Sequence, residues 1–174
     1  MSFPHEEVRA AWENFVAVGD SGDWEAWADL HTVDGVWVEH HLGTFQGRDA
    51  IKRAIVDVMA MAPKDMCFPV EWVAFDGDRV VYYPWQVLPH PAGGEPFRFG
   101  CVTVLTYAGD GQFSSRYHCA SESTVSWAFR PLGLGRTHRS APSNPSGWWP
   151  TAMPLAPNAC RKAVTTSTAT TLGR

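Results

Sequence analysis

Residues 35–51, GVWVEHHLGTFQGRDAI, constrain the fold more than any other part of the chain. A strand-like apolar run ends in Glu39, His40 and His41, turns at Gly43 and passes through polar residues 46–49 into a helix. Burying polar groups without partners costs about 1–3 kcal/mol each, so these side chains form either a solvated edge or the wall of a pocket. The aromatic-rich sequence around them favours the pocket.

Helical patterns precede and follow this segment, and strand patterns then take over. Apolar spacing predicts a helix over residues 4–19 and another over residues 48–62. Between them, a short helix is expected to begin after a cap at Asp23 and to end at about residue 30. Strands are expected over residues 35–41, 67–75, 79–88, 97–107 and 112–121, with hairpin signals at 76–78 and 109–111. We expect an α+β domain over residues 1–130, with three N-terminal helices packed on one face of an antiparallel sheet that curls around them and encloses a pocket.

The charge is unevenly distributed along the sequence. All 18 acidic residues lie in residues 1–130 with nine of the 14 Lys and Arg residues, which gives that part a net charge of −9. An acidic domain of this kind is not expected to bind nucleic acid. Residues 131–174 carry +5, no acid and many Pro, Ser and Thr residues, so we expect a basic, largely irregular C-terminal tail.

The sequence shows no signal for membranes or metals. It has no basic leader followed by an apolar run and no apolar stretch of membrane-spanning length. Its four cysteines show no CxxC spacing, and no HExxH or glycine-rich phosphate motif is present. These features predict a cytoplasmic protein that needs neither a metal nor a cofactor and has no membrane partner.

Two segments resemble a known family. They are AVGDSGDWEAWADLHTVDGVWVEHHLGTFQGRDAI at 17–51 and LTYAGDGQFSSRYHCAS at 105–121. In element order and in these motifs, residues 4–130 resemble the nuclear transport factor 2-like superfamily, and within it the SnoaL-like, polyketide cyclase-like group. The resemblance implies a conical cavity for a small hydrophobic molecule and a homodimer formed through the sheet. Members include cyclases, isomerases, dehydratases, epoxide hydrolases and proteins that only bind.

The resemblance also indicates individual positions. His40 stands where ketosteroid isomerases place a proton-shuttling Asp, and His118 stands where cyclases and epoxide hydrolases carry an acidic residue. Phe15 and Thr103 replace the two oxyanion donors of the isomerases, which argues against steroid isomerisation. Side chains alternate along a strand, so only one of His40 and His41 can face inward, and the family match favours His40.

The expected chemistry is general acid–base catalysis. Histidine has an ordinary pKa near ~6.5, so two imidazoles in one cavity can exchange protons near neutral pH. Arg116 shares a face with His118 and can bind a carbonyl or carboxylate, while Glu39 or Glu71 can orient an imidazole. The expected catalytic residues are His40, His118 and Arg116. The expected substrate-binding residues are Phe15, Trp37, Thr103 and Tyr117.

The sequence therefore predicts a cofactor-free lyase- or isomerase-type enzyme. It would be a cyclase, isomerase, dehydratase or hydratase acting on a polyketide-, steroid- or terpenoid-like molecule in an enclosed pocket. Two alternatives stay open, namely a non-catalytic small-molecule binding protein of the same fold and a protein-interaction module.

Overall fold

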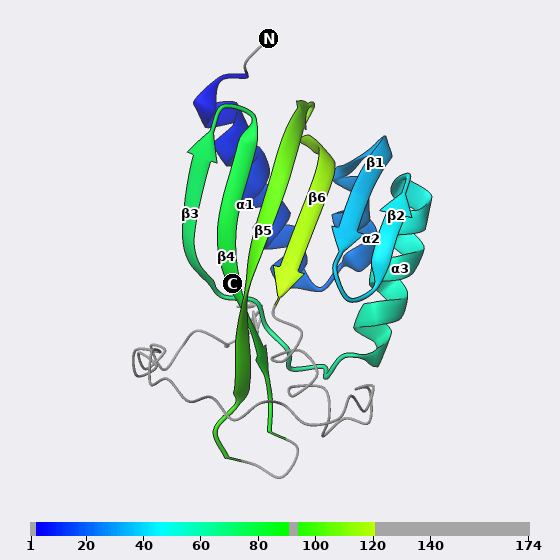
Figure 1. Ribbon diagram of the computed structural model, residues 1–174, viewed down its shortest axis with the longest axis vertical. Helices are drawn as coiled ribbons and strands as arrows, with labels where there is room; N and C mark the ends of the chain where they lie inside the picture. Colours follow the sequence, from blue (N-terminus) through cyan, green and yellow to red (C-terminus); the bar gives the residue numbers. More distant parts are fainter. Residues whose placement is uncertain (1–2, 91–93, 121–174) are drawn as a thin grey trace, which may run out of the picture. The chain divides into compact units, whose positions relative to one another are not determined.

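A six-stranded sheet and three helices make up the described part of the chain. The computed structural model describes residues 3–90 and 94–120. The helices are α1 (His5–Ser21), α2 (Trp24–Asp29) and α3 (Arg48–Met61). The strands are β1 (His31–Glu39), β2 (Gly43–Gln46), β3 (Val70–Asp76), β4 (Arg79–Leu88), β5 (Phe97–Gly109) and β6 (Gln112–Ala120). Their order across the sheet is β2-β1-β6-β5-β4-β3, as Figure 1 shows.

The junction between α1 and α2 follows from its capping residues. Gly22 adopts a left-handed conformation (φ 77°), and its N–H donates to the Gly19 carbonyl at the end of α1. The Asp23 carboxylate then accepts a hydrogen bond from the Ala26 N–H at 2.9 Å and caps α2. The helix start predicted at Asp23 is confirmed, whereas α1 ends at Ser21, two residues after its predicted end.

The sheet is antiparallel except where β1 meets β6, which run parallel. β1 begins at His31, four residues before the predicted strand, and ends at Glu39. Residues 43–46, where the sequence predicts a turn at Gly43 and no strand, form the edge strand β2. Phe45 explains this strand, because its ring packs against Trp37 of β1 with 5.1 Å between centroids.

The main core lies between the helices and one face of the sheet. Its fully buried members include Val8 of α1, Ala28 of α2, Ile51 of α3, Leu105 of β5 and Phe113 of β6. The α+β class and the curved sheet are therefore confirmed. In the part of the chain that is described, no helix is long and apolar enough to cross a membrane.

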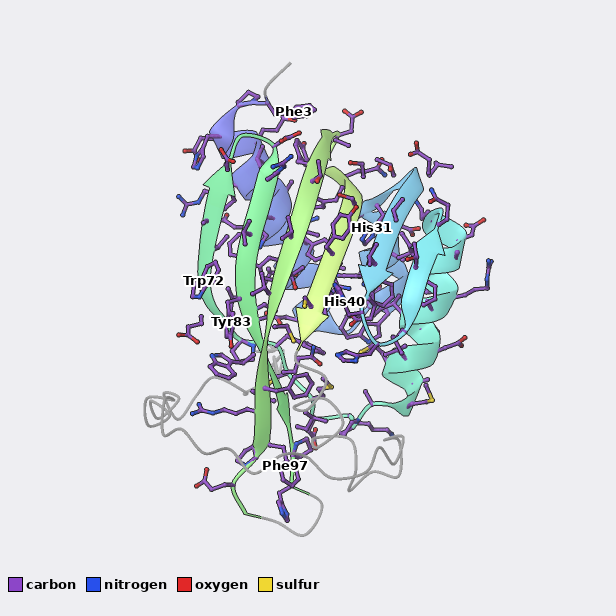
Figure 2. The ribbon with its side chains drawn as sticks, viewed as in Figure 1. Phe3, His31, His40, Trp72, Tyr83 and Phe97 are labelled. Atoms are coloured by element: carbon purple, nitrogen blue, oxygen red, sulfur yellow. The ribbon has the colours of Figure 1, made fainter. Side chains whose placement is uncertain are left out.

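The other face of the sheet carries no helix in the described structure (Figure 1). Trp72, Val102 and Tyr117 on this face are 44 %, 40 % and 49 % exposed. Trp72 of β3 stacks on Tyr83 of β4, with 5.9 Å between ring centroids (Figure 2). We call this surface of β3–β6 the outer sheet face.

Two predictions about organisation concern residues beyond the described part. The boundary near residue 130 and the Pro/Ser/Thr-rich segment 131–174 both lie outside it. The enclosed pocket also stays a prediction.

Candidate functional site

A cluster of buried polar side chains lies where β1, β6 and β5 run side by side. Strand pairing sets Glu39 beside His118, Trp37 beside Arg116, and Thr103 beside His118. All five residues are buried, and they project from the sheet face that packs on the helices. Three strands distant in sequence therefore assemble the cluster, which we call the His118 cluster.

The imidazole of His118 is held in one tautomer. Its Nδ1 lies 3.1 Å from Nη2 of Arg116 and 2.8 Å from Oγ1 of Thr103. A guanidinium group can only donate hydrogen bonds, so Nδ1 must be an acceptor without a proton. The ring proton of neutral His118 consequently sits on Nε2.

Nε2 of His118 faces the amide of Gln86 and the carboxyl group of Glu39. Nε2 of the Gln86 amide lies 2.9 Å from Nε2 of His118 and 3.1 Å from Sγ of Cys101. Burial raises the pKa of the Cys101 thiol to about 12, so this neighbour is an S–H donor. Because neutral His118 carries its proton on Nε2 and needs an acceptor here, we assign the Gln86 amide oxygen to this position, where a protonated thiol can also donate to it.

Arg116 is a buried cation held between aromatic walls. Its guanidinium carbon lies 5.1 Å from the ring centroid of Trp27 and 5.0 Å from that of Trp37, and the two indole planes meet at 75°. Each cation–π contact is worth about 0.5–2 kcal/mol. Nε and Nη1 of this side chain have no hydrogen-bond partner among the described residues.

Burial and the charge of Arg116 set the protonation of the cluster. Burial, and secondarily Arg116, lowers the pKa of His118 well below its ordinary value, so the ring is neutral at neutral pH. Burial raises the pKa of Glu39, and the attraction of Arg116 opposes this rise. Oε2 of Glu39 lies 3.8 Å from Nε2 of His118. A carboxyl group with a raised pKa beside a neutral donor is suited to exchange protons.

His31 is a second buried histidine, at the start of β1. It is fully buried, and burial, followed by Arg116, lowers its pKa to about 4. Its Nδ1 lies 3.2 Å from the Ala28 carbonyl, so Nδ1 carries the proton. Its backbone carbonyl accepts a 2.6 Å hydrogen bond from Nε of Arg48, which fixes the start of α3 against β1.

The structure separates the residues predicted from sequence into two groups. His118, Arg116, Trp37 and Thr103 come together in the His118 cluster. Phe15 is 2 % exposed and packs in the core against Trp27, His31 and Phe113.

Two side chains do not reach the cluster. The expectation that His40 faces inward is wrong, because β1 ends at Glu39 with that side chain buried and His40 is exposed (Figure 2). Tyr117 lies between the inward residues Arg116 and His118 and therefore points to the outer sheet face, 49 % exposed.

Sequence reasoning missed part of this cluster. Gln86 was not singled out, and Glu39 was considered only as a group that orients an imidazole. A usable signal was present, because the aromatic Trp37 marks the buried face of β1 and Glu39 is two residues further on. Glu71, the other carboxylate considered, is exposed on β3.

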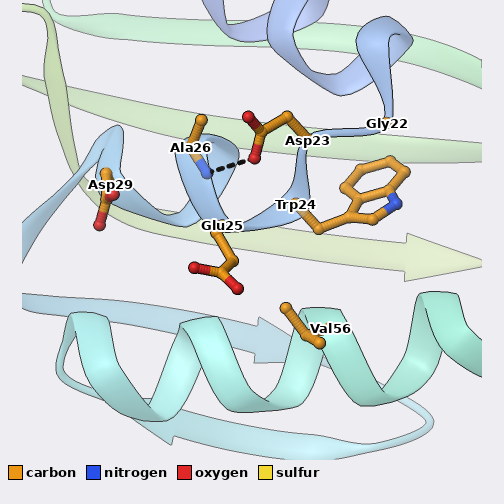
Figure 3. A pocket seen from close by; sticks show the side chains of 7 residues that line it. All are labelled: Gly22, Asp23, Trp24, Glu25, Ala26, Asp29 and Val56. Atoms are coloured by element: carbon orange, nitrogen blue, oxygen red, sulfur yellow. Dashed lines mark hydrogen bonds between the residues drawn. The ribbon is translucent and has the colours of Figure 1, made fainter.

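A separate surface hollow lies between α2 and α3 (Figure 3). It measures about 530 Å³, and its lining includes the acidic residues Asp23, Glu25 and Asp29. Two of these carboxylates are already engaged, since Asp23 caps α2 and Asp29 pairs with Lys52 at 2.8 Å. Within the described ranges, no three His, Cys, Asp or Glu side chains are grouped to hold a metal ion. The buried His118 cluster is therefore the better candidate site.

Comparison with known proteins places this geometry in a family. Residues 7–116 match the model of the SnoaL-like domain. A hypothetical protein with a ketosteroid isomerase-like fold from Catenulispora acidiphila DSM 44928, solved with trimethylamine, is 22 % identical. It superposes with a TM-score of 0.59 over 75 % of this chain and 98 % of its own.

A second solved structure, TerC co-crystallised with polyporic acid, is 20 % identical. Its TM-score is 0.58, over 72 % of this chain and 97 % of its own. No curated protein matches the sequence. The fold is thus the ketosteroid isomerase-like one, and the chain belongs to the SnoaL-like domain family.

Proposed function

We propose that the protein is an acid–base enzyme acting on a small hydrophobic carbonyl compound, with Glu39 as the group that takes up and returns the proton. The reaction class is enolisation followed by isomerisation, ring closure or loss of water. Such steps need a base for a C–H next to a carbonyl and a positive group for the oxygen that gains charge.

Glu39 fits the base. It is 8 % exposed, and burial raises its pKa above the ordinary glutamate value, which makes the carboxylate a stronger base. In the proposed step its carboxylate removes the proton, and the C–H electron pair moves to form the enolate. The resulting carboxylic acid then returns the proton to another atom of the substrate.

Arg116 and His118 fit the stabilisation of the enolate oxygen. The unpartnered Nε–H and Nη1 groups of Arg116 provide positively charged donors in a buried setting. His118 is neutral and keeps its Nδ1 occupied by Arg116 and Thr103, so we assign it to positioning the guanidinium and the carboxyl group. The observation that carries the proposal is the buried pair of Glu39 and His118 at 3.8 Å.

Exchange of substrate hydrogen for deuterium tests the proposal directly. We would follow loss of the α-proton signal of 2-tetralone and of a panel of cyclic 1,3-diketones in D₂O by NMR. Wild type should accelerate exchange, and Glu39→Gln should slow it by about 10²–10⁴-fold. Glu71→Gln is the matched control, because Glu71 is exposed on β3, and it should exchange like wild type. Unchanged exchange in Glu39→Gln, or no acceleration by wild type, would reject the proposal.

A non-catalytic binding protein is the second candidate. The observation in its favour is that both ring nitrogens of His118 already have partners within the protein. A binder would hold the same ketones without exchanging their protons. Binding measured by calorimetry together with exchange at the buffer rate would favour this role.

We further propose that a second copy of the chain covers the outer sheet face. The aromatic and β-branched side chains of this face are exposed, and no helix of the described structure packs on them. Two copies related by a two-fold axis would pair such a face with itself, and a stable dimer needs about 800 Å² from each partner.

A further inference from the structure

No carboxylate of the described residues forms a direct ion pair with the buried cation Arg116, although Glu39 lies near enough to be attracted by it. Arg116 is 9 % exposed. Its polar contacts are neutral, with His118 accepting from Nη2 and the Tyr82 hydroxyl close by. Buried charges are ordinarily paired, so this arrangement is costly for a side chain with a purely structural role.

Other arginines of the chain illustrate the contrast. Nε of Arg9 pairs with Glu13 at 3.0 Å on the surface, and Nε of Arg48 is satisfied by the His31 carbonyl. Nε and Nη1 of Arg116 have neither kind of partner among the described residues. The guanidinium is therefore fixed by Trp27, Trp37 and His118 while several of its donors are left unused.

We propose that these unused donors of Arg116 bind a delocalised oxyanion, either a carboxylate or an acidic enolate, carried on a flat apolar frame. The inference rests on the proposed function in that it names the substrate class of the same site. Guanidinium groups bind planar oxyanions through charge-assisted hydrogen bonds, and the Trp27 and Trp37 rings that hold Arg116 make the surroundings of its donors apolar.

Binding of small aromatic acids tests this without any catalytic readout. Calorimetry would compare benzoate with its neutral analogue benzamide, and the enolate-forming dimedone with neutral cyclohexanone, on the full chain at neutral pH. We expect each anion to bind at least tenfold more tightly than its neutral analogue. Equal binding within a pair, or no binding of either anion at millimolar concentration, would overturn the proposal. The two pairs distinguish a carboxylate site from an enolate site.

Variants assign the binding to one side chain. Arg116→Gln should weaken anion binding at least tenfold, while Arg116→Lys, which keeps the charge, should retain more of it. Arg98→Gln is the matched control, because Arg98 also lies over a tryptophan, Trp85, at 5.1 Å but on the outer sheet face. Loss of binding in Arg98→Gln with full binding in Arg116→Gln would overturn the assignment. If Arg116→Gln does not fold, the comparison of each anion with its neutral analogue on the wild-type chain decides the outcome.

The Glu39→Gln variant separates this inference from the proposed function. It should slow proton exchange by about 10²–10⁴-fold. It should nevertheless bind benzoate at least as tightly as wild type, because a competing carboxyl group near Arg116 is removed. Retained anion binding with no proton exchange in wild type would support the anion site and reject the enzyme. Proton exchange in wild type without selectivity for anions would support the enzyme and reject the anion site.

Discussion

Trp37 and Arg116 occupy partner positions on the parallel strands β1 and β6, and the guanidinium carbon lies 5.0 Å from the indole centroid. This contact joins the core to the His118 cluster, because Trp37 also packs against Trp27 and Phe45. The indole therefore serves both packing and the position of the buried charge. The two roles can be separated by substitution.

Replacing Trp37 should show how much of its contribution is aromatic. Trp37→Ala should destabilise the fold by about 3–5 kcal/mol, because a large side chain that is 2 % exposed is lost and Arg116 loses one wall. Trp37→Phe keeps an aromatic face and removes an indole N–H that has no partner among the described residues, so its cost should be much smaller. Urea unfolding measures both, and equal losses would contradict the role of the ring face.

The two buried histidines should carry their protons on opposite nitrogens. His118 is protonated on Nε2 because Arg116 donates to Nδ1, whereas His31 is protonated on Nδ1 because it faces a carbonyl. Heteronuclear NMR on protein labelled with ¹⁵N-histidine distinguishes the two tautomers at neutral pH. Thr103→Val should leave the His118 tautomer unchanged, since the Arg116 contact persists. The same tautomer at both positions would refute the network described here.

The error at His40 shows what local sequence can and cannot predict. Capping residues such as Asp23 and the hairpin glycines predict the ends of helices and strands, because these signals act within a few residues. The face of a strand depends on a one-residue register, and a shift of one residue turns every side chain over. Matching His40 to a family position introduced that shift, although Trp37 indicated the buried face. The parallel pairing of β1 with β6, which brings Glu39 to His118, is non-local and has no signature in either strand.

His31 should make the fold sensitive to acid. Its pKa is about 4 in the fold against an ordinary 6.5, so the unfolded chain binds more protons between these values. Stability should therefore be fully present above pH 6.5 and fall by about 3 kcal/mol as the pH drops to 4. His118, whose pKa is also lowered, adds to the loss in the same direction.

Substitution isolates the contribution of His31. His31→Phe keeps a ring against Phe15 and Trp27 and should flatten the dependence of unfolding free energy on pH between 6.5 and 4. His40→Gln, at an exposed position, should leave the dependence as it is in wild type. An equally steep loss in His31→Phe would show that other groups govern acid unfolding.

Dimerisation through the outer sheet face should depend on its exposed apolar side chains. A glutamate at position 72 or 102 would place a charge within the proposed interface, where it would be desolvated without a partner. Trp72→Glu and Val102→Glu should each weaken self-association at least tenfold while the monomer keeps its circular dichroism spectrum. Val33→Glu is the matched control, because Val33 is 76 % exposed on β1, outside this face, and it should associate like wild type. Sedimentation velocity at micromolar concentrations measures the association. A monomeric wild type, or unchanged association in both variants, would show that a second copy does not cover this face.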